Sequence, residues 1–175
     1  MISANNQHDT IIDFITGQPK TDVGAERDRQ LIERHLVEAK GYAKGDIDID
    51  WPIRFEVNAE EYISKVDLVV RVKGKPFMAI KCAPGSLDSR QREIVAAAQL
   101  LVHYQIPLAI AASGKDAIVW DTLSGKQIGR GMEFVPTKEH AEGTFDLNAL
   151  QPLPPERRRQ VQLIFRSYDS MNVNR

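Results

Sequence analysis

Three consecutive extended segments occupy the centre of the chain and constrain its fold more than any other feature. DIDIDWPIRFEV (residues 46–57) alternates acidic and apolar residues, SKVDLVVRV (64–72) is rich in valine, and PFMAIKCA (76–83) follows a tight GKP turn. Runs of this kind predict β-strands, and the short turns between them predict a meander. The centre of the chain is therefore expected to form a β-sheet.

Helical patterns lie on both sides of this meander. Residues 22–40 carry an apolar stripe among charged residues, formed by Leu31, Ile32 and Leu36, and Gly41 ends the helix. Residues 86–105 predict a second helix with Ser86 or Asp88 as its N-cap. A helix at this place allows a right-handed crossover to a parallel strand.

The rest of the chain completes the expected order. LAIAAS (108–113) and AIVWDT (117–122) predict two more strands, the SGK and IGRG sequences after them predict turns, and residues 136–153 look loop-like. PPERRRQVQLIFRSY predicts a terminal helix with Pro155 in its first turn. The fold class is therefore α/β, a mixed central sheet flanked by helices in the order α-β-β-β-α-β-β plus a C-terminal helix.

This order also suggests how the chain is divided. We expect an N-terminal arm over residues 1–20 with one ordered apolar piece (IIDFI), a main domain over 21–136, and a loop with the C-terminal helix over 137–175.

Composition narrows the classes of function. The 24 acidic and 23 basic residues give a net charge of −1, so binding to nucleic acid requires a local basic patch. The single cysteine, Cys82, excludes a disulfide framework and a cysteine-rich zinc site and is expected to be a small buried apolar residue. No Gly-Lys pair has the context of a phosphate-binding loop, so no nucleotide cofactor is expected.

No sequence feature predicts a membrane association. The polar start MISANNQHD lacks a signal pattern, and the apolar run IVAAAQLL is too short to cross a bilayer. We therefore expect a cytoplasmic domain.

Strand alternation brings two opposite charges together. Asp67 is expected opposite the face of Val66, Leu68, Val70 and Val72, and Lys81 on the face of Phe77, Ala79 and Ala83. If the two strands are neighbours, the carboxylate and the ammonium meet on one face. Burying a charge is costly unless it is paired or binds a metal, so this pair is either an ion pair or a site.

A set of short motifs carries a resemblance to a known family. They are Glu26–Gln30, KGY (40–42), VDLVV around Asp67, the GKP turn, IKCAP (80–84) and YQIP (104–107). Together they resemble the N-terminal nuclease-like domain of type I restriction enzyme R subunits, within the PD-(D/E)XK nuclease superfamily. The resemblance covers about residues 24–136 and implies a restriction-endonuclease-like fold.

The resemblance also implies a site. In the family, an Asp on the second strand and a Glu two residues before a Lys on the third strand bind Mg²⁺, and the lysine positions water or stabilises charge. Asp67 is then the metal ligand and Lys81 its catalytic partner. Glu26 or Glu33 of the first helix, with Gln99 and Tyr104 of the second, are the supporting residues that the resemblance implies.

The third strand departs from the family pattern. Aligning Cys82 and Pro84 puts Lys81 at the position of the acid and Ala83 at that of the lysine. A shift by two keeps Lys81 as the lysine but leaves Ala79 at the position of the acid. The metal-binding acid is missing in both registers, so the resemblance predicts a degenerate site, which needs Mg²⁺ only if it is active.

Three functions remain open. The first is a stand-alone nuclease-fold domain that has lost cleavage and binds DNA or a protein partner. The second is an active Mg²⁺-dependent endonuclease that recruits an acid from Glu26, Glu33 or the loop at Glu60 and Glu61. The third is a homodimeric scaffold with no nucleic-acid role.

Several basic residues are candidates for contact with a partner. Arg90, Arg92 and Lys115 are the candidates for contacts with DNA phosphates. The cluster Arg157–Arg159 lies on a helix that also carries apolar residues, which suggests that the helix docks on the domain or on a partner with its arginines in water.

Overall fold

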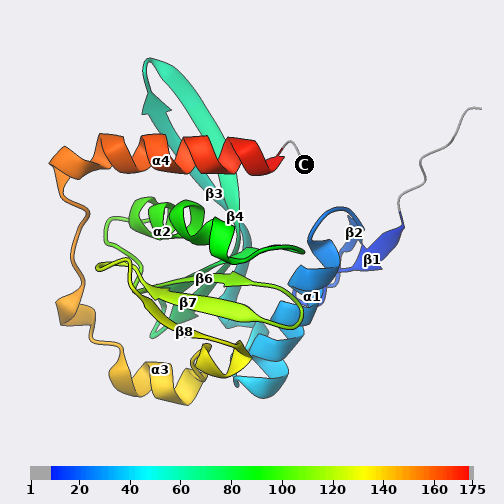
Figure 1. The fold of residues 1–175 in the computed structure, drawn as a ribbon. Helices are drawn as coiled ribbons and strands as arrows, with labels where there is room; N and C mark the ends of the chain where they lie inside the picture. The colour runs from blue at the N-terminus through cyan, green and yellow to red at the C-terminus, as the bar shows by residue number, and fades with distance from the viewer. Residues whose placement is uncertain (1–8, 174–175) are drawn as a thin grey trace, which may run out of the picture.

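The structure is a computed structural model that describes residues 9–173, and its centre is a six-stranded sheet. The strands lie in chain order, with bounds Ile47–Val57 (β3), Glu60–Val72 (β4), Lys75–Cys82 (β5), Leu108–Ala112 (β6), Ala117–Asp121 (β7) and Gln127–Arg130 (β8). All neighbours pair antiparallel except β5 and β6, which pair parallel across the helical crossover. The expected mixed sheet and meander are confirmed (Figure 1).

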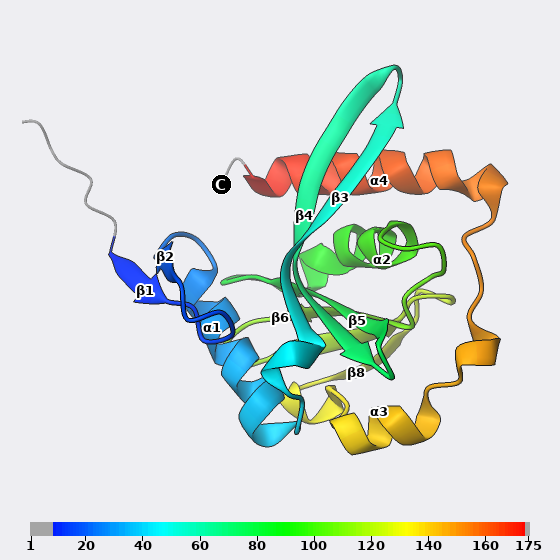
Figure 2. The same ribbon diagram turned by 180° about the vertical axis from the view of Figure 1, so that it is seen from behind.

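Helices cover both faces of this sheet. They are α1 (Glu26–Arg34), which continues into a π-helical turn (His35–Ala39), α2 (Gln91–Leu100), α3 (Lys138–Thr144) and α4 (Pro155–Val173). Short 3₁₀ turns occupy Lys44–Asp46, Asp88–Arg90, Met132–Phe134 and Leu147–Ala149. The ribbon views place α2 and α4 on one side of the sheet and α1 and α3 toward the other (Figures 1 and 2).

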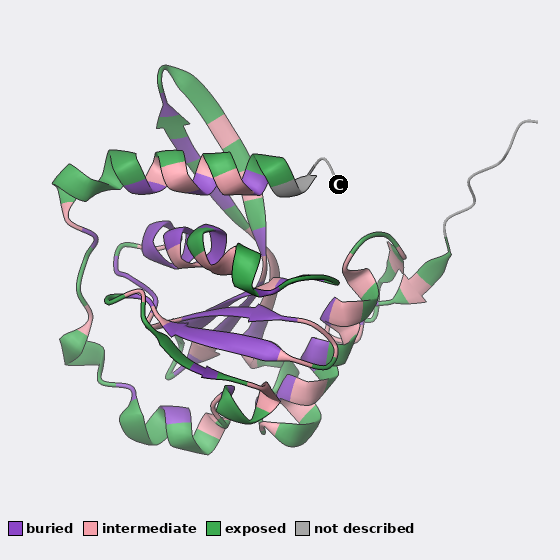
Figure 3. Cartoon of the chain, in the orientation of Figure 1, coloured by how far each residue is buried: buried purple, intermediate pink, exposed green. Residues whose placement is uncertain are grey.

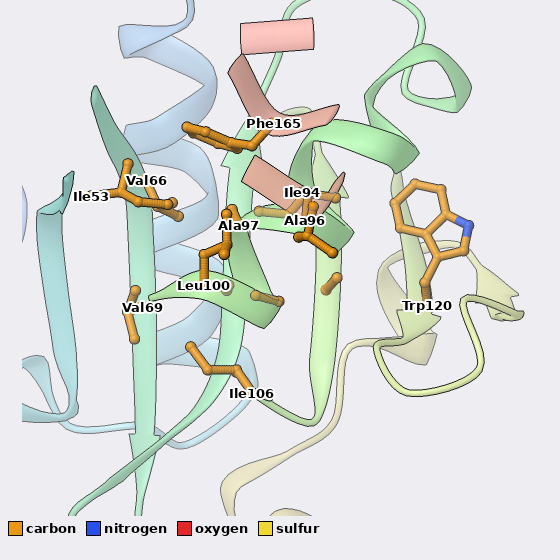
Figure 4. Packing of buried hydrophobic residues seen from close by; sticks show 14 of the residues in the cluster. Ile53, Val66, Val69, Ile94, Ala96, Ala97, Leu100, Ile106, Trp120 and Phe165 are labelled. Atoms are coloured by element: carbon orange, nitrogen blue, oxygen red, sulfur yellow. The ribbon is translucent and has the colours of Figure 1, made fainter. Parts of the chain in front are cut away.

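The core has two parts, one on each face. On the α2 side, Ile94, Ala97 and Leu100 pack against the sheet, and Phe165 of α4 closes the cluster (Figure 4). The small alanines of α2 let the helix approach the strands closely. On the other face, α1 buries Ile32 and Leu36. Buried residues accordingly concentrate in the sheet and on the inner faces of the helices (Figure 3).

The β3–β4 ribbon changes sides along its length. At its base Leu68 packs in the α1-side cluster, whereas Val66 packs in the α2-side cluster with Ile53 and Phe165. The expectation that Val66 shares a face with Leu68 was therefore wrong. The ribbon bends where Asp50 adopts a positive φ of 51°, and beyond this point it rises beside α4 (Figure 2).

Some predicted helix and strand bounds were wrong. The second helix begins at Gln91 after a 3₁₀ turn, its N-cap is Arg90, and neither Ser86 nor Asp88 caps it with a side chain. It ends at Leu100, and the Ile106 N–H then donates to the Ala98 carbonyl in the last turn of the helix. The first three residues of the IGRG sequence (128–130) belong to β8, because Ile118 and Val119 of β7 pair with this strand.

Two other segments hold more structure than expected. Residues 136–153 contain α3, which begins because the Thr137 hydroxyl accepts the His140 N–H as an N-cap. The expected arm contains a hairpin of β1 (Thr10–Ile12) and β2 (Pro19–Thr21), while residues 1–8 of that arm lie outside the described residues. Leu31 is 51% exposed, so it is not part of the buried stripe of α1.

Across residues 9–173, none of the helices has both the length and the apolar character that crossing a membrane requires.

Candidate functional site

The site lies where β4 and β5 separate. Their regular pairing ends at Leu68 and Ile80. Beyond this pair, the Cys82 N–H donates to Oδ2 of Asp67 at 2.7 Å, so a side-chain oxygen of β4 accepts from the backbone of β5. The Lys81 Nζ lies 3.9 Å from the same oxygen, and both side chains are 20% exposed. Asp67 and Lys81 thus lie together, as strand alternation predicts.

A residue that the sequence reasoning missed completes this group. Glu93 of α2 is 2% exposed, and its Oε1 lies 3.2 Å from the Lys81 Nζ. Arg90, one helical turn earlier, lies 3.7 Å from the other oxygen of Glu93. The ammonium of Lys81 therefore lies between two carboxylates that come from β4 and α2.

Burial controls the electrostatics of this group. It raises the pKa of Asp67, and Lys81 only partly offsets the rise. It also raises the pKa of Glu93, again against the effect of Lys81. Burial alone would lower the pKa of Lys81, but Asp67 and Glu93 outweigh it, and the pKa of Lys81 is raised. Both carboxylates therefore favour a nearby positive charge, and they share one ammonium.

A second buried group of charges surrounds Arg29 of α1, which is 3% exposed. Its guanidinium lies 2.9 Å from Asp13, 2.5 Å from Glu26, 3.4 Å from Asp50 and 3.6 Å from Glu33. Four acidic residues from three segments thus converge on Arg29, which joins the N-terminal hairpin, α1 and β3.

The acidic residues around Arg29 differ in their protonation. Burial raises the pKa of Asp13, but hydrogen bonds from Thr16 and Gln30 and the charge of Arg29 outweigh it, and the pKa falls below its ordinary value. Burial and the charge of Asp13 raise the pKa of Glu33 to about 7.

A pocket of about 190 Å³ connects the two groups of charges. It is lined by Val23, Ala25, Glu26, Arg29, Asp50, Lys65, Asp67 and Cys82. Asp50 is held there by Lys20 at 2.6 Å and Lys65 at 2.9 Å. Asp67 therefore faces an opening that Glu26 also reaches, whereas Glu33 does not line it.

The structure places the other predicted supporting residues elsewhere. The Gln99 side-chain amide donates to Gln105, and the Tyr104 hydroxyl donates to the Pro76 carbonyl. These contacts stabilise the segment that connects α2 to β6, and they do not involve Asp67 or Lys81. Glu60, at the tip of the β3–β4 hairpin, pairs with Arg166 of α4.

The predicted phosphate contacts are spread over three places. Arg90 belongs to the site through Glu93. Arg92 donates to the Tyr168 hydroxyl at 2.8 Å on the α4 side, and Lys115 is exposed in the turn between β6 and β7. Cys82 is buried as expected, and burial raises the pKa of its thiol.

The donor set of this site is small. Within residues 9–173, no group of three or more His, Cys, Asp or Glu residues is arranged to hold a metal ion. The site offers the two carboxylates of Asp67 and Glu93 around Lys81.

Comparison with known proteins gave one match. The family model for the N terminus of type I restriction enzyme R proteins matches residues 24–136, which is more than half of the chain. Searches among curated proteins and among solved structures gave no match.

Proposed function

Since this chain belongs to the family of type I restriction enzyme R protein N termini, we propose that it is a DNA-binding domain of the PD-(D/E)XK nuclease fold. The observation that carries the proposal is the group of charges at the separation of β4 and β5. Asp67 and Lys81 keep only 20% exposure there and line up on one face of the sheet. Buried charges cost stability, and they cluster at functional sites.

A polar groove beside this site supplies suitable contacts for a nucleic-acid strand. It has a volume of about 260 Å³ and lies between α2, α4 and the turn after β7. Arg92, Arg157, Gln91 and Gln160 are among its lining residues. Arginine and glutamine side chains are common donors to DNA phosphates. Arg92 and the buried Glu93 are consecutive residues of α2, so the same helix contributes to the groove and to the site.

Binding to labelled duplex DNA, measured by fluorescence anisotropy in EDTA at several salt concentrations, tests this proposal. Affinity should fall as salt rises, because each phosphate contact releases counterions. The double variant Arg92→Ala/Arg157→Ala should bind more weakly, and its salt slope should be smaller by about 2, since each phosphate contact contributes about 0.9.

A matched control removes the same charge elsewhere. Arg34→Ala/Lys75→Ala alters two exposed positions on α1 and at the start of β5. It should keep the salt slope of the unmodified protein. An equal loss of DNA affinity in both double variants would mean that only the net charge of the protein matters. A protein that binds no DNA at low salt would contradict the proposal.

A catalytically degenerate interaction module is the second candidate. One observation favours it: Lys81 already gives Asp67 and Glu93 a positive counter-charge without any metal. Such a module would bind a protein partner or a second copy of the chain and would show no salt-dependent binding to DNA. Sedimentation equilibrium at several protein concentrations distinguishes the homodimer.

A further inference from the structure

We propose that the β3–β4 ribbon carries an interface for a second copy of this chain, and that the two ribbons pack face to face in opposite directions. The outer face of the ribbon, which the second copy contacts, consists of six exposed residues: Pro52, Arg54, Glu56, Glu61, Ile63 and Lys65. The interface involves no DNA, so it does not depend on the DNA-binding proposal, and it gives the second candidate function a surface.

Only one face of the ribbon is covered. β5 pairs with β4 between Leu68 and Val72, so residues 60–66 of β4 pair with β3 alone. On the inner face, Phe165 of α4 packs against the rings of Phe55 and Tyr62. Figure 2 shows the ribbon from the opposite side, with α4 behind it and no element of residues 9–173 in front of it. The outer face is therefore open to a partner.

Contacts with α4 hold the ribbon in place. Arg166 pairs with Glu60 at 2.8 Å, and Arg159 donates to the Asn58 side chain at 3.1 Å, both near the tip. These polar contacts add to the packing of Phe165 on the inner face. A surface that is already fixed loses little conformational entropy when it binds, which favours association.

Charge is unevenly distributed along the outer face. From the base to the tip, the strand register pairs Pro52 with Lys65, then Arg54 with Ile63, then Glu56 with Glu61. The base and the middle are therefore cationic, and the end near the tip is acidic. Two glutamates directly opposite each other destabilise a strand pair. Within residues 9–173, the side chains of Arg54, Glu56 and Glu61 make no ion pair, whereas Lys65 pairs with Asp50.

This distribution of charge is complementary to itself. Two ribbons that lie face to face in opposite directions place the acidic end of each against the cationic part of the other. Arg54 and Glu56 are separated by two residues, or about 7 Å along the strand. A two-fold axis between them therefore brings Arg54 of each copy to Glu56 of the other, as an isologous interface requires. Ribbons in the same direction would place acid against acid.

The centre of the outer face is apolar. Ile63 is 53% exposed and lies beside Arg54, between the cationic and the acidic parts. Contact with a second copy would remove its side chain from water. The open edge of β3 is less suited to a partner, because Pro52 lacks an N–H donor and Asp50 bends the strand with a positive φ of 51°. The partner therefore packs on the face and does not extend the sheet.

The size of the outer face predicts a weak dimer. A standard interface buries about 800 Å² on each partner and uses about 20–30 residues a side. The six residues of the outer face provide less than that, so the dimer should dissociate on dilution. It should also weaken as salt rises, because its contacts between exposed charges are screened.

Sedimentation equilibrium of the full chain without DNA, at protein concentrations from about 1 μM to 1 mM, tests the interface. The unmodified protein should show a reversible monomer–dimer equilibrium. Arg54→Glu should raise the dissociation constant by about tenfold or more, because the outer face then lacks its unpaired cation and acid meets acid. Ile63→Ser should raise it by about tenfold through the loss of apolar contact. Circular dichroism shows whether each variant is folded.

A charge exchange tests the direction of the ribbons. Arg54→Glu/Glu56→Arg keeps the net charge and exchanges the two partners on both copies, so it should restore the dissociation constant to within about threefold of the unmodified value. Arg158→Glu is the control for a reversal of charge elsewhere, since Arg158 is exposed on α4 and is not part of the outer face. It should dimerise as the unmodified protein does.

Three results would overturn the proposal. One is an unmodified protein that stays monomeric up to about 1 mM. Another is a dimer whose dissociation constant changes neither with Arg54→Glu nor with Ile63→Ser, which would place the interface elsewhere. The third is a charge-exchange variant that is folded and dimerises as weakly as Arg54→Glu, which would exclude ribbons in opposite directions.

Discussion

Arg29 shows how a single buried cation organises several acidic residues. It contacts Asp13, Glu26, Glu33 and Asp50, which come from the N-terminal hairpin, α1 and β3. Asp50 also pairs with Lys20 and Lys65, and Asp13 accepts hydrogen bonds from Thr16. The buried carboxyl that lies farthest from Arg29, at 3.6 Å, is favoured in its neutral form. That residue is Glu33, whose pKa is raised to about 7.

The raised pKa of Glu33 predicts a pH-dependent stability. A carboxyl whose pKa is higher in the folded than in the unfolded state destabilises the fold as pH rises. The loss of folding stability begins near pH 4.5, the ordinary pKa of a glutamate, grows up to about pH 7 and stays constant above that pH. Glu33→Gln lacks this loss, so at pH 8 it should be more stable than the unmodified protein by about 1–3 kcal/mol.

Chemical denaturation at pH 4.5 and pH 8 measures this difference. The two proteins should have similar free energies of unfolding at pH 4.5, because Glu33 is then protonated. Glu38→Gln is the control, since Glu38 is exposed and pairs only at 3.7 Å with Arg34. A constant difference between Glu33→Gln and the unmodified protein at both pH values would show that Glu33 does not titrate as described.

Among the elements, α4 joins parts of the sheet that are distant in sequence. Phe165 is 1% exposed and contacts the rings of Phe55 and Tyr62 on the β3–β4 ribbon edge to face. The Tyr62 hydroxyl donates to Asp169 one turn further along α4. The same helix therefore covers α2, holds the ribbon and brings Asp169 near Lys81.

Truncation of Phe165 measures the contribution of this docking. Phe165→Ala should lower the free energy of unfolding by about 3–5 kcal/mol, the usual cost of removing a buried phenylalanine ring. Leu163→Ala, on the same helix but 38% exposed, should cost about 1 kcal/mol or less. Equal costs at the two positions would mean that α4 does not dock through Phe165.

Several elements were predictable from local pattern. Strand alternation identified Asp67 and Lys81 as neighbours, and the helix after the third strand led to the parallel pair of β5 and β6. The local sequence pattern predicted a turn at IGRG, because its two glycines are typical of turns. The structure has the edge strand β8 there, and this strand is held by its pairing with β7.

The site was less predictable than the sheet. The sequence analysis missed Glu93. This residue shares the buried stripe of α2 with Ala96, Ala97 and Leu100. A glutamate at such a position indicates a buried charge that needs a partner. Asp13 was missed in the same way within the apolar IIDFI sequence. The burial of these acids is stabilised by Lys81 and Arg29, which lie on other elements. The sequence alone does not show that these cations are neighbours of the acids.

For the whole molecule, the group of charges at Asp67 predicts the outcome of a plasmid assay. The Lys81 ammonium lies between Asp67 and Glu93, where a divalent ion would have to bind. Supercoiled plasmid incubated with the protein and Mn²⁺ should therefore stay supercoiled, as in a parallel sample with EDTA. Gel electrophoresis measures the fraction of nicked plasmid.

Nicking that both EDTA and Asp67→Ala abolish would contradict this prediction and would favour an active metal-dependent endonuclease. Intact plasmid leaves the anisotropy experiment as the measure of DNA binding, and it favours the degenerate interaction module if that experiment also fails.

The hairpin of β1 and β2 has a consequence for where a usable fragment can begin. The family match starts at residue 24, yet Asp13 and Lys20 compensate Arg29 and Asp50 from before that point. The match also stops before α4, so a fragment of residues 24–136 would expose the apolar surface of α2 under Phe165. We expect such a trimmed fragment to aggregate, whereas one that retains the hairpin and α4 should purify as a folded species.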